Sequence, residues 1–149
     1  GMNLALCCDL VVASENARFS EIFAKRGLSV DFGGSFLLPR IVGLQKAKEL
    51  VLLAEVLSAA EADRMGLISY VVPHDQLDDK ALELAQKAAS GPPRALAMSK
   101  AMLNKSFANS LQDALDQEGT SQTVNFTTKD VSEAMKAFQE KRPPRFSGW

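Results

Sequence analysis

The chain has 149 residues, of which 46% are apolar and 23% are charged, and its formal net charge is -1. This length and apolar content are sufficient for one core of ordinary size. Without a basic tract there is no electrostatic basis for binding nucleic acid. No apolar run approaches the roughly 18 residues of a membrane span, and no signal peptide is visible, so we expect no membrane partner.

Two cysteines and one histidine are the side chains most typical of metal sites. Cys7 and Cys8 are adjacent in an apolar stretch, which suits neither a disulfide nor a zinc site. We therefore expect buried free thiols, no metal and a cytoplasmic location. His74 follows Pro73 in a predicted turn and has no nucleophile motif beside it, which favours a surface role.

The beginning of the chain is predicted to alternate between short strands and turns. Residues 3–8 are apolar and fit either a helix end or a strand. Residues 10–13 suit a buried strand, and residues 17–19 alternate like a brief second one. Because the chain enters this apolar region without a polar lead-in, we expect it to begin inside a larger fold.

The next stretch, Gly27–Ser35, places an acid before a pair of glycines. Asp31 precedes Phe32-Gly33-Gly34 at the predicted start of a helix, where glycines let backbone N–H groups approach a ligand. Phe32 and the apolar run 36–38 predict that this loop lies against the core. An acid in such surroundings has its pKa raised toward values useful in proton transfer. The alternative is that Asp31 only caps the following helix.

Helices are predicted to dominate the rest of the chain. The first covers residues 33–41, with Pro39 shortening or kinking it, and apolar residues at helical spacing predict a second over 44–54. Ser58–Glu61 is a capping box that opens a short third helix. Residues 68–72 are rich in β-formers and predict another strand.

Four more apolar stripes at helical spacing follow this strand, over residues 77–88, 93–103, 110–115 and 128–138. Ser110 with Asp113 is predicted to open the third of these helices, and Thr128 with Asp130 the fourth. Phe146 and Trp149 make the end of the chain aromatic. Such a tail is expected to dock either on its own core or on another subunit. No repeat or flexible linker is visible, so we expect a single domain.

The order of short motifs resembles the enoyl-CoA hydratase/isomerase, or crotonase, family. The matching segments cover nearly the whole chain in the family order: Gly1–Ala5 with Cys8–Leu10, Ala17–Phe19, Gly27–Leu28 with Asp31–Ser35, Leu38–Gly43, Ser58–Ala62, Gly66–Ile68 and Ala137–Arg142. Each segment is modest alone, but together they are specific. The segment Asp-x-Gly-Gly-Ser-x-Leu-Leu-Pro-Arg is most similar to the epoxyphenylacetyl-CoA isomerase type.

This resemblance implies an α/β fold of crotonase type, of which the chain would hold the C-terminal portion. Residues 1–73 would be a residual ββα core and residues 74–149 a helical trimerisation region, in a homo-oligomer that is a trimer or hexamer in the family. The implied substrate is an acyl-CoA thioester, with no separate cofactor. Two backbone N–H groups would form an oxyanion hole for its carbonyl. One donor would lie outside this chain and the other in a glycine run that ends at Gly1.

The resemblance also assigns roles to side chains. The two water-activating glutamates of hydratases fall at Asn3 and Phe23, which cannot transfer a proton. Glu21 would replace the second only if the local chain stayed extended. Asp31 matches an aspartate that is functional in some relatives and is the candidate catalytic residue. One carboxylate suffices to move a double bond, whereas hydration needs two polar groups around a water.

Substrate contacts are expected from Gly1, Phe23, Gly33, Gly34 and Lys141. Lys141 matches a lysine that can reach the adenine and phosphate end of CoA, and the alternative is a solvated lysine. We therefore expect isomerisation of an enoyl-CoA through a thioester enolate, with the activity of this chain alone left open. The alternatives are a non-catalytic acyl-CoA-binding protein and a gene fragment without a function of its own.

Overall fold

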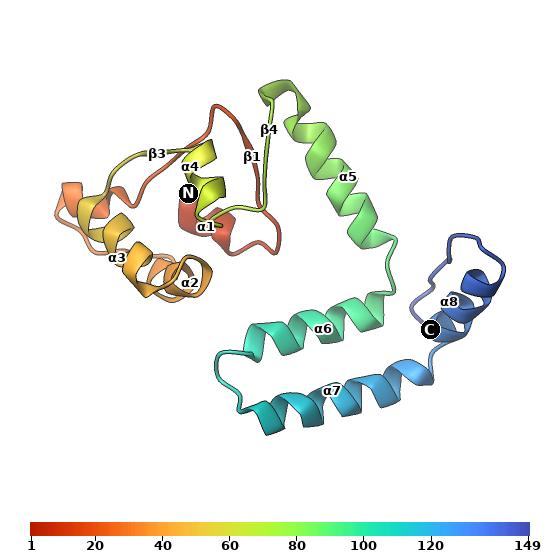
Figure 1. The fold of residues 1–149 in the computed structure, drawn as a ribbon. Helices are drawn as coiled ribbons and strands as arrows, with labels where there is room; N and C mark the ends of the chain where they lie inside the picture. Colours follow the sequence, from red (N-terminus) through yellow and green to blue (C-terminus); the bar gives the residue numbers. More distant parts are fainter. The chain divides into compact units, whose positions relative to one another are not determined.

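Helices predominate and strands are short in the computed structural model, which describes residues 1–149 (Figure 1). The chain divides into two compact units, Gly1–Glu83 and Leu84–Trp149. The division falls inside helix α5 (Leu77–Ala89). None of the helices combines the length and the apolar character needed to cross a membrane.

The first unit contains all of the strands. Its elements are α1 (Met2–Leu6), β1 (Val12–Ser14), β2 (Arg18–Phe19), the 3-10 helix η1 (Ile22–Arg26), α2 (Gly34–Ile41), α3 (Leu44–Leu53), β3 (Leu57–Ser58), α4 (Ala59–Arg64), β4 (Tyr70–Val72) and the 3-10 helix η2 (His74–Gln76). The three predicted strands are present in shortened form, and residues 3–8 are mostly helical. Strand β3 was not predicted, since two residues carry almost no periodicity.

Two separate strand pairs organise this unit. Strands β1 and β4 are parallel, with Val12 opposite Tyr70 and Ser14 opposite Val72. Because parallel neighbours require a crossover, helices α2 to α4 all lie within the connection between β1 and β4. Strands β2 and β3 are antiparallel, with Arg18 opposite Ser58.

The core of the first unit lies where α1, α2, α3 and α4 meet strand β1. It consists of apolar side chains that are almost fully buried, namely Leu6, Ala13, Leu38, Ala47, Leu50, Ala62, Leu67 and Ile68. Leu38 anchors α2 in this core with only 1% of its surface exposed, so the start of α2 is held firmly against its neighbours.

Side-chain caps set the beginnings of three helices, as the sequence predicted. Ser58 Oγ accepts a hydrogen bond from Glu61 N, and the Glu61 carboxylate accepts one from Ser58 N at 2.8 Å, which completes a capping box at α4. Ser110 and Asp113 form the same box at α7 (Leu111–Phe126). Thr128 caps α8 (Lys129–Gln139).

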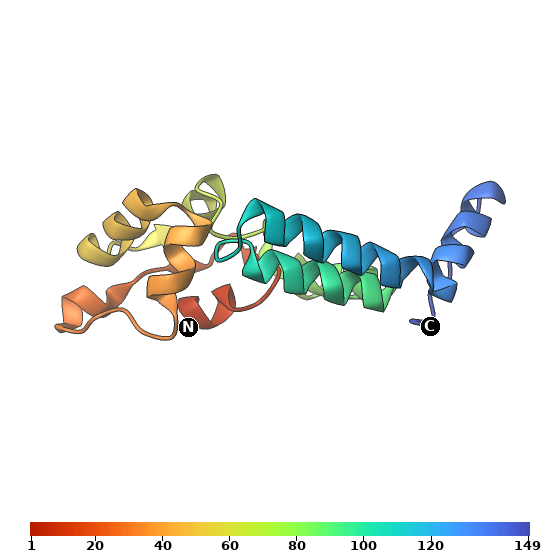
Figure 2. The ribbon, with the colours of Figure 1, turned by 90° about the horizontal axis from the view of Figure 1, so that it is seen from below.

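The second unit is entirely helical. It contains the end of α5, followed by α6 (Pro93–Lys105), α7 and α8. Helices α6 and α7 lie side by side (Figures 1 and 2). Neither of them has a single buried residue, so their apolar stripes find too little partner surface within this chain.

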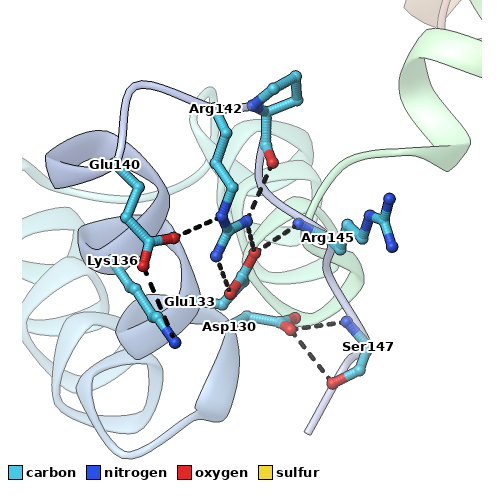
Figure 3. A network of polar contacts seen from close by, with 8 residues as sticks. Asp130, Glu133, Lys136, Glu140, Arg142, Arg145 and Ser147 are labelled. Atoms are coloured by element: carbon cyan, nitrogen blue, oxygen red, sulfur yellow. Dashed lines mark hydrogen bonds and ion pairs between the residues drawn. The ribbon is translucent and has the colours of Figure 1, made fainter.

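The C-terminal tail is bound to α8 and α6 through polar groups. The Asp130 carboxylate accepts a hydrogen bond from the backbone N–H group of Ser147 at 2.7 Å (Figure 3). It accepts another from the N–H group of Gly148 at 3.0 Å. Arg94 Nε donates to Gly148 O at 2.7 Å. The backbone of the tail is therefore bound to its own chain, but Trp149 stays 69% exposed, so the expected docking of this aromatic side chain on the core is not found.

Glu133 is the centre of a second anchor for the tail. Its carboxylate accepts two hydrogen bonds from the Arg142 guanidinium, at 2.6 and 3.0 Å, and one from Arg145 N at 2.9 Å (Figure 3). These bonds, with that of the Arg142 side chain first, lower the pKa of Glu133 to about 2. The ionised carboxylate is the form that holds the tail.

Acid should therefore release the tail from α8. The pKa of Glu133 is lower in the folded state than in the unfolded chain. Its ionised carboxylate therefore stabilises the bound tail fully at pH values above the unfolded pKa of about 4.3. This stabilisation is lost as the pH falls toward about 2.

At neutral pH, Glu133→Gln should accelerate tryptic cleavage after Arg145 roughly threefold or more. The control, Glu118→Gln on exposed α7, should leave cleavage unchanged, and equal cleavage of both variants would contradict this role.

Candidate active site

The loop that carries Asp31 makes a tight left-handed turn into α2. Phe32 and Gly33 have φ values of 49° and 78°, and Gly33 occupies the N-cap position of the helix. Asp31 O accepts a hydrogen bond from Gly34 N at 2.9 Å, which closes the turn. A left-handed φ favours glycine at position 33, while Phe32 is strained there.

The structure contradicts the alternative in which Asp31 caps the helix. The cap residue is Gly33, and no side chain makes a capping hydrogen bond at α2. The Asp31 residue is exposed and its carboxylate is left to solvent or to a ligand. The apolar surroundings expected around this acid are therefore not found in this chain, where the carboxylate is exposed and makes no capping bond.

The expected packing of this loop against the core is wrong. Phe32 and Phe36 are 61% and 56% exposed, whereas Gly34 and Leu38 are buried. For Phe36 the physical reason is the helical repeat: turning Gly34 and Leu38 of α2 toward the core turns Phe36, two residues from each, outward. Phe32 precedes the helix and lies in the left-handed turn. The sequence shows four apolar residues in this region but not which pair the core accepts.

A buried polar pair lies directly behind the Asp31 loop. Asn3, on α1, is 3% exposed and Glu21, at the start of η1, is 1% exposed. Asn3 Nδ2 donates one hydrogen bond to Glu21 Oε2 at 3.3 Å and another to Asp31 O at 3.1 Å. The amide of Asn3 thus connects a buried carboxyl group to the backbone of the candidate catalytic residue.

The surroundings of Glu21 favour its neutral form. Burial raises the pKa of Glu21, the Asn3 hydrogen bond and the amino group of Gly1 lower it, and the charge of Asp31 raises it. Glu21 Oε1 and Asn3 Oδ1 have no hydrogen-bond partner. The signal for this buried acid in the sequence is a glutamate directly before the apolar run 22–24.

Gly34 allows α1 and α2 to approach at this point. A Cβ atom at Gly34 would lie 2.5 Å from Asn3 Nδ2 and 2.6 Å from a methyl carbon of Val30. Such separations are far below van der Waals contact, so only glycine fits between these two side chains. The glycine pair after Asp31 therefore has two separate roles: Gly33 makes the turn, and Gly34 makes room for Asn3.

An apolar groove of about 440 Å³ begins beside this loop and runs between α2 and α3. Its walls are formed mostly by apolar side chains, with one serine and one lysine among them: Val30, Gly34, Ser35, Leu38, Pro39, Leu44, Ala47, Lys48, Val51 and Leu52. Val30 and Gly34 flank Asp31 in sequence, so an apolar chain in the groove would start close to the candidate acid.

Comparison with known families matches the enoyl-CoA hydratase/isomerase family over residues 1–148. The chain belongs to this family. Its α/β fold of crotonase type, expected from the sequence, is confirmed by solved structures of the family. An enoyl-CoA hydratase from Bacillus anthracis aligns with a TM-score of 0.96 at 35% identity, covering 100% of this chain and 58% of that one.

The relatives of this chain include hydratases and an isomerase. A probable enoyl-CoA hydratase from Mycobacterium bovis is 39% identical over 99% of this chain and 57% of its own length. The 1,2-epoxyphenylacetyl-CoA isomerase of Escherichia coli is also 39% identical, over 99% of this chain and 56% of its own length. The chain thus spans a little over half the length of these relatives.

Phe23, Glu21 and Gly1 are the other residues of the first unit to which the family resemblance assigns or offers a role. Phe23 lies half-buried in η1, where its carbonyl accepts a hydrogen bond from Leu28 N at 3.0 Å. Glu21 could take the role of Phe23 only if the chain between them were extended. Residues 22–26 instead form the 3-10 helix η1, and the Glu21 side chain is bonded to Asn3. Gly1 is exposed and its carbonyl starts α1 by accepting from Ala5 N.

Lys141 belongs to the second unit, directly after α8. Its φ is 53° and its N–H donates to Phe138 O at 3.3 Å, which ends the helix. The residue is exposed, and the neighbouring Arg142 is fixed by Glu133. The side chain of Lys141 is therefore presented from a well-anchored backbone.

The two cysteines differ from their expected burial. Cys7 and Cys8 are both exposed, with free thiols. The reason is that α1 ends at Leu6, which is the last residue of this helix to face the core. His74 is exposed as expected and its Nδ1 lies 3.2 Å from Ser14 Oγ.

Proposed function

We propose that the complete protein moves a double bond within an enoyl-CoA thioester and that Asp31 transfers the proton. The observation that carries this proposal is the Asp31 carboxylate itself. It is exposed at the N-terminus of α2 and makes no capping bond, while its backbone carbonyl is held by Gly34 N and Asn3 Nδ2. The two bonds fix the backbone that carries the carboxylate, and the absence of a capping bond leaves its oxygens able to accept a proton.

The chemistry requires only one such group. The carboxylate removes a proton from one carbon of the acyl chain, and the electron pair is delocalised onto the thioester oxygen as an enolate. The resulting carboxylic acid then returns a proton to another carbon, and the enolate collapses to the thioester with the double bond moved. No oxidant or reductant is needed, and Asp31 ends in its starting state.

Hydration is less well supported by the same residues. Asn3 uses both hydrogens of its amide in bonds to Glu21 and Asp31, and Phe23 is apolar. Neither residue can activate water. Similarity to relatives does not favour either reaction, since a probable hydratase and an isomerase are equally similar to the chain.

An assay of the complete gene product with 3-enoyl-CoA and 2-enoyl-CoA thioesters tests this proposal. We expect conversion of the 3-enoyl to the 2-enoyl isomer to exceed hydration of the 2-enoyl substrate by about tenfold or more. Hydration at an equal or greater rate would contradict the proposal. Tight binding of acyl-CoA without turnover would instead support a non-catalytic acyl-CoA-binding protein.

The same proposal includes the remaining expectations about ligand and location. The acyl-CoA thioester is the substrate, with no further cofactor, and Gly1, Phe23, Gly33, Gly34 and Lys141 contact it. Lys141 supplies a positive charge for the phosphate end of CoA. The protein is expected to work in the cytoplasm.

We further infer that the chain functions as a homo-oligomer. Helices α6 and α7 bury none of their residues within the chain, although both have apolar stripes. Several large apolar side chains of the second unit are more than half exposed, namely Leu103, Phe107, Leu111, Phe126, Met135, Phe138 and Trp149. Apolar surface on this scale is typical of an interface.

Light scattering coupled to gel filtration tests the oligomer. We expect a mass of three or six times the protomer, and a fall in the binding of a hydrophobic dye as the assembly forms at higher concentration. The reason is that association removes the apolar faces of these helices from water. A chain that stays monomeric at micromolar concentration, with low dye binding, would contradict the inference.

A further inference from the structure

The geometry points to Glu21 as a positioning residue that acts through Asn3 on the Asp31 loop. It holds the backbone carbonyl of Asp31 in place and so orients the proton-transferring carboxylate. The catalytic consequence rests on the proposed function, whereas the positioning itself does not.

The contact between these residues is a short chain of hydrogen bonds that joins three elements. Glu21 Oε2 accepts from Asn3 Nδ2 at 3.3 Å, and the same nitrogen donates to Asp31 O at 3.1 Å. Glu21 belongs to the start of η1, Asn3 to α1 and Asp31 to the loop before α2. The Asn3 amide can donate to the loop only while its plane is held, and Glu21 is the group that holds it.

Core packing alone does not account for a glutamate at this position. Glu21 is among the largest fully buried side chains of the structure, and its second oxygen has no partner. Burying a carboxyl group with an unpaired oxygen is unfavourable compared with burying an apolar side chain of the same size. The residue therefore contributes something other than stability, and its one hydrogen bond leads to the Asp31 loop.

Gly34 ensures that a movement of Asn3 reaches the loop. The Asn3 amide lies so close to Gly34 that a Cβ atom there would be 2.5 Å from its nitrogen. Gly34 N also donates to Asp31 O, so the carbonyl is held from two sides. If the Asn3 amide rotated, one of these two bonds would be lost, and the Asp31 backbone would be free to turn.

The charged groups around Glu21 are few. The amino group of Gly1 and the carboxylate of Asp31 act on it in opposite directions, and Asn3 is its only hydrogen-bond partner. An ionised Glu21 would place a second negative charge next to Asp31. Burial, the largest effect, raises the pKa of Glu21, and the charge of Asp31 raises it further, whereas the hydrogen bond from Asn3 lowers it.

Amide hydrogen exchange tests the positioning without any reference to activity. The variants are Glu21→Met, which removes the acceptor at similar volume, Glu21→Gln, which keeps an acceptor, and Leu50→Ala, which weakens the core from α3. In Glu21→Met the exchange of Gly34 N–H should rise roughly tenfold relative to Ala47 N–H in α3. In Glu21→Gln the ratio should stay within about twofold of wild type. In Leu50→Ala both amides should change together.

Equal exchange ratios in Glu21→Met and wild type would overturn the positioning role. An exchange ratio in Glu21→Gln as high as that in Glu21→Met would also overturn it. If Glu21→Met fails to fold, Asn3→Ala removes the bridge from its other end by truncation, and the same ratio is expected to rise.

Kinetics of the complete gene product separate this role from the proposed function. If that protein isomerises enoyl-CoA, Glu21→Met should lower kcat more than it raises KM, and Glu21→Gln should restore kcat. A Glu21→Met variant with normal exchange and normal kcat overturns the positioning role. Altered exchange in a protein without isomerase activity supports the positioning role and refutes the proposed function alone.

Discussion

Asp31→Asn should lower the isomerase turnover number of the complete gene product by about 10²- to 10⁴-fold, the usual contribution of a general acid or base. Asparagine keeps the shape of the side chain but cannot take up a proton. Because Asp31 is exposed and caps nothing, the fold should not change. Turnover of 3-enoyl-CoA, affinity for a saturated acyl-CoA and the melting temperature together check this result.

The matched control is Asp63→Asn. Asp63 is an exposed aspartate on α4. It carries the same charge as Asp31, so a general electrostatic effect would act through both positions. We expect Asp63→Asn to retain full turnover. Wild-type turnover in Asp31→Asn would show that this carboxylate does not carry the proton. The assignment of the chain to its family does not depend on this result.

Gly34→Ala should destabilise the protein by about 1–3 kcal/mol, as overpacking of a filled site usually does. The added Cβ would lie 2.5 Å from Asn3 Nδ2 and 2.6 Å from Val30 Cγ2. Asn3 is buried and bonded to both Glu21 and Asp31 O, so it cannot move aside without losing a hydrogen bond. Denaturant unfolding measures the loss directly.

Gly119→Ala is the control for Gly34→Ala. Gly119 lies inside α7, and a Cβ atom there would meet nothing within 4 Å. Alanine is the better helix former, so this variant should be more stable than wild type by about 0.5–1 kcal/mol. Opposite signs for the two glycines are the expected result. A Gly34→Ala variant as stable as wild type would show that α1 and α2 tolerate a wider separation here.

Local patterns in the sequence predicted the local elements well. The capping boxes at Ser58 and Ser110 join residues only three positions apart, so the pattern contains the whole interaction. The strand predicted at residues 68–72 was found as β4, shortened to three residues. Family motifs spread over the chain predicted the crotonase fold, since their order is a property of the sequence.

Longer-range contacts were the ones that the sequence could not supply. The burial of Cys7, Cys8 and the Asp31 loop was predicted wrongly, because apolar neighbours in sequence need not face the same core. Glu21 was considered on an extended chain beside Phe23, but a 3-10 turn directs it elsewhere.

The sequence by itself determined the family, the helix starts and the presence of an aspartate before two glycines. Only the tertiary structure showed that this aspartate does not cap the helix. It also showed that Asn3 and Gly34 donate hydrogen bonds to its backbone carbonyl. Asn3 joins partners 18 and 28 residues away in the chain. Such contacts depend on how α1 and α2 pack, and packing is decided by the shapes of all neighbours together rather than by any local pattern.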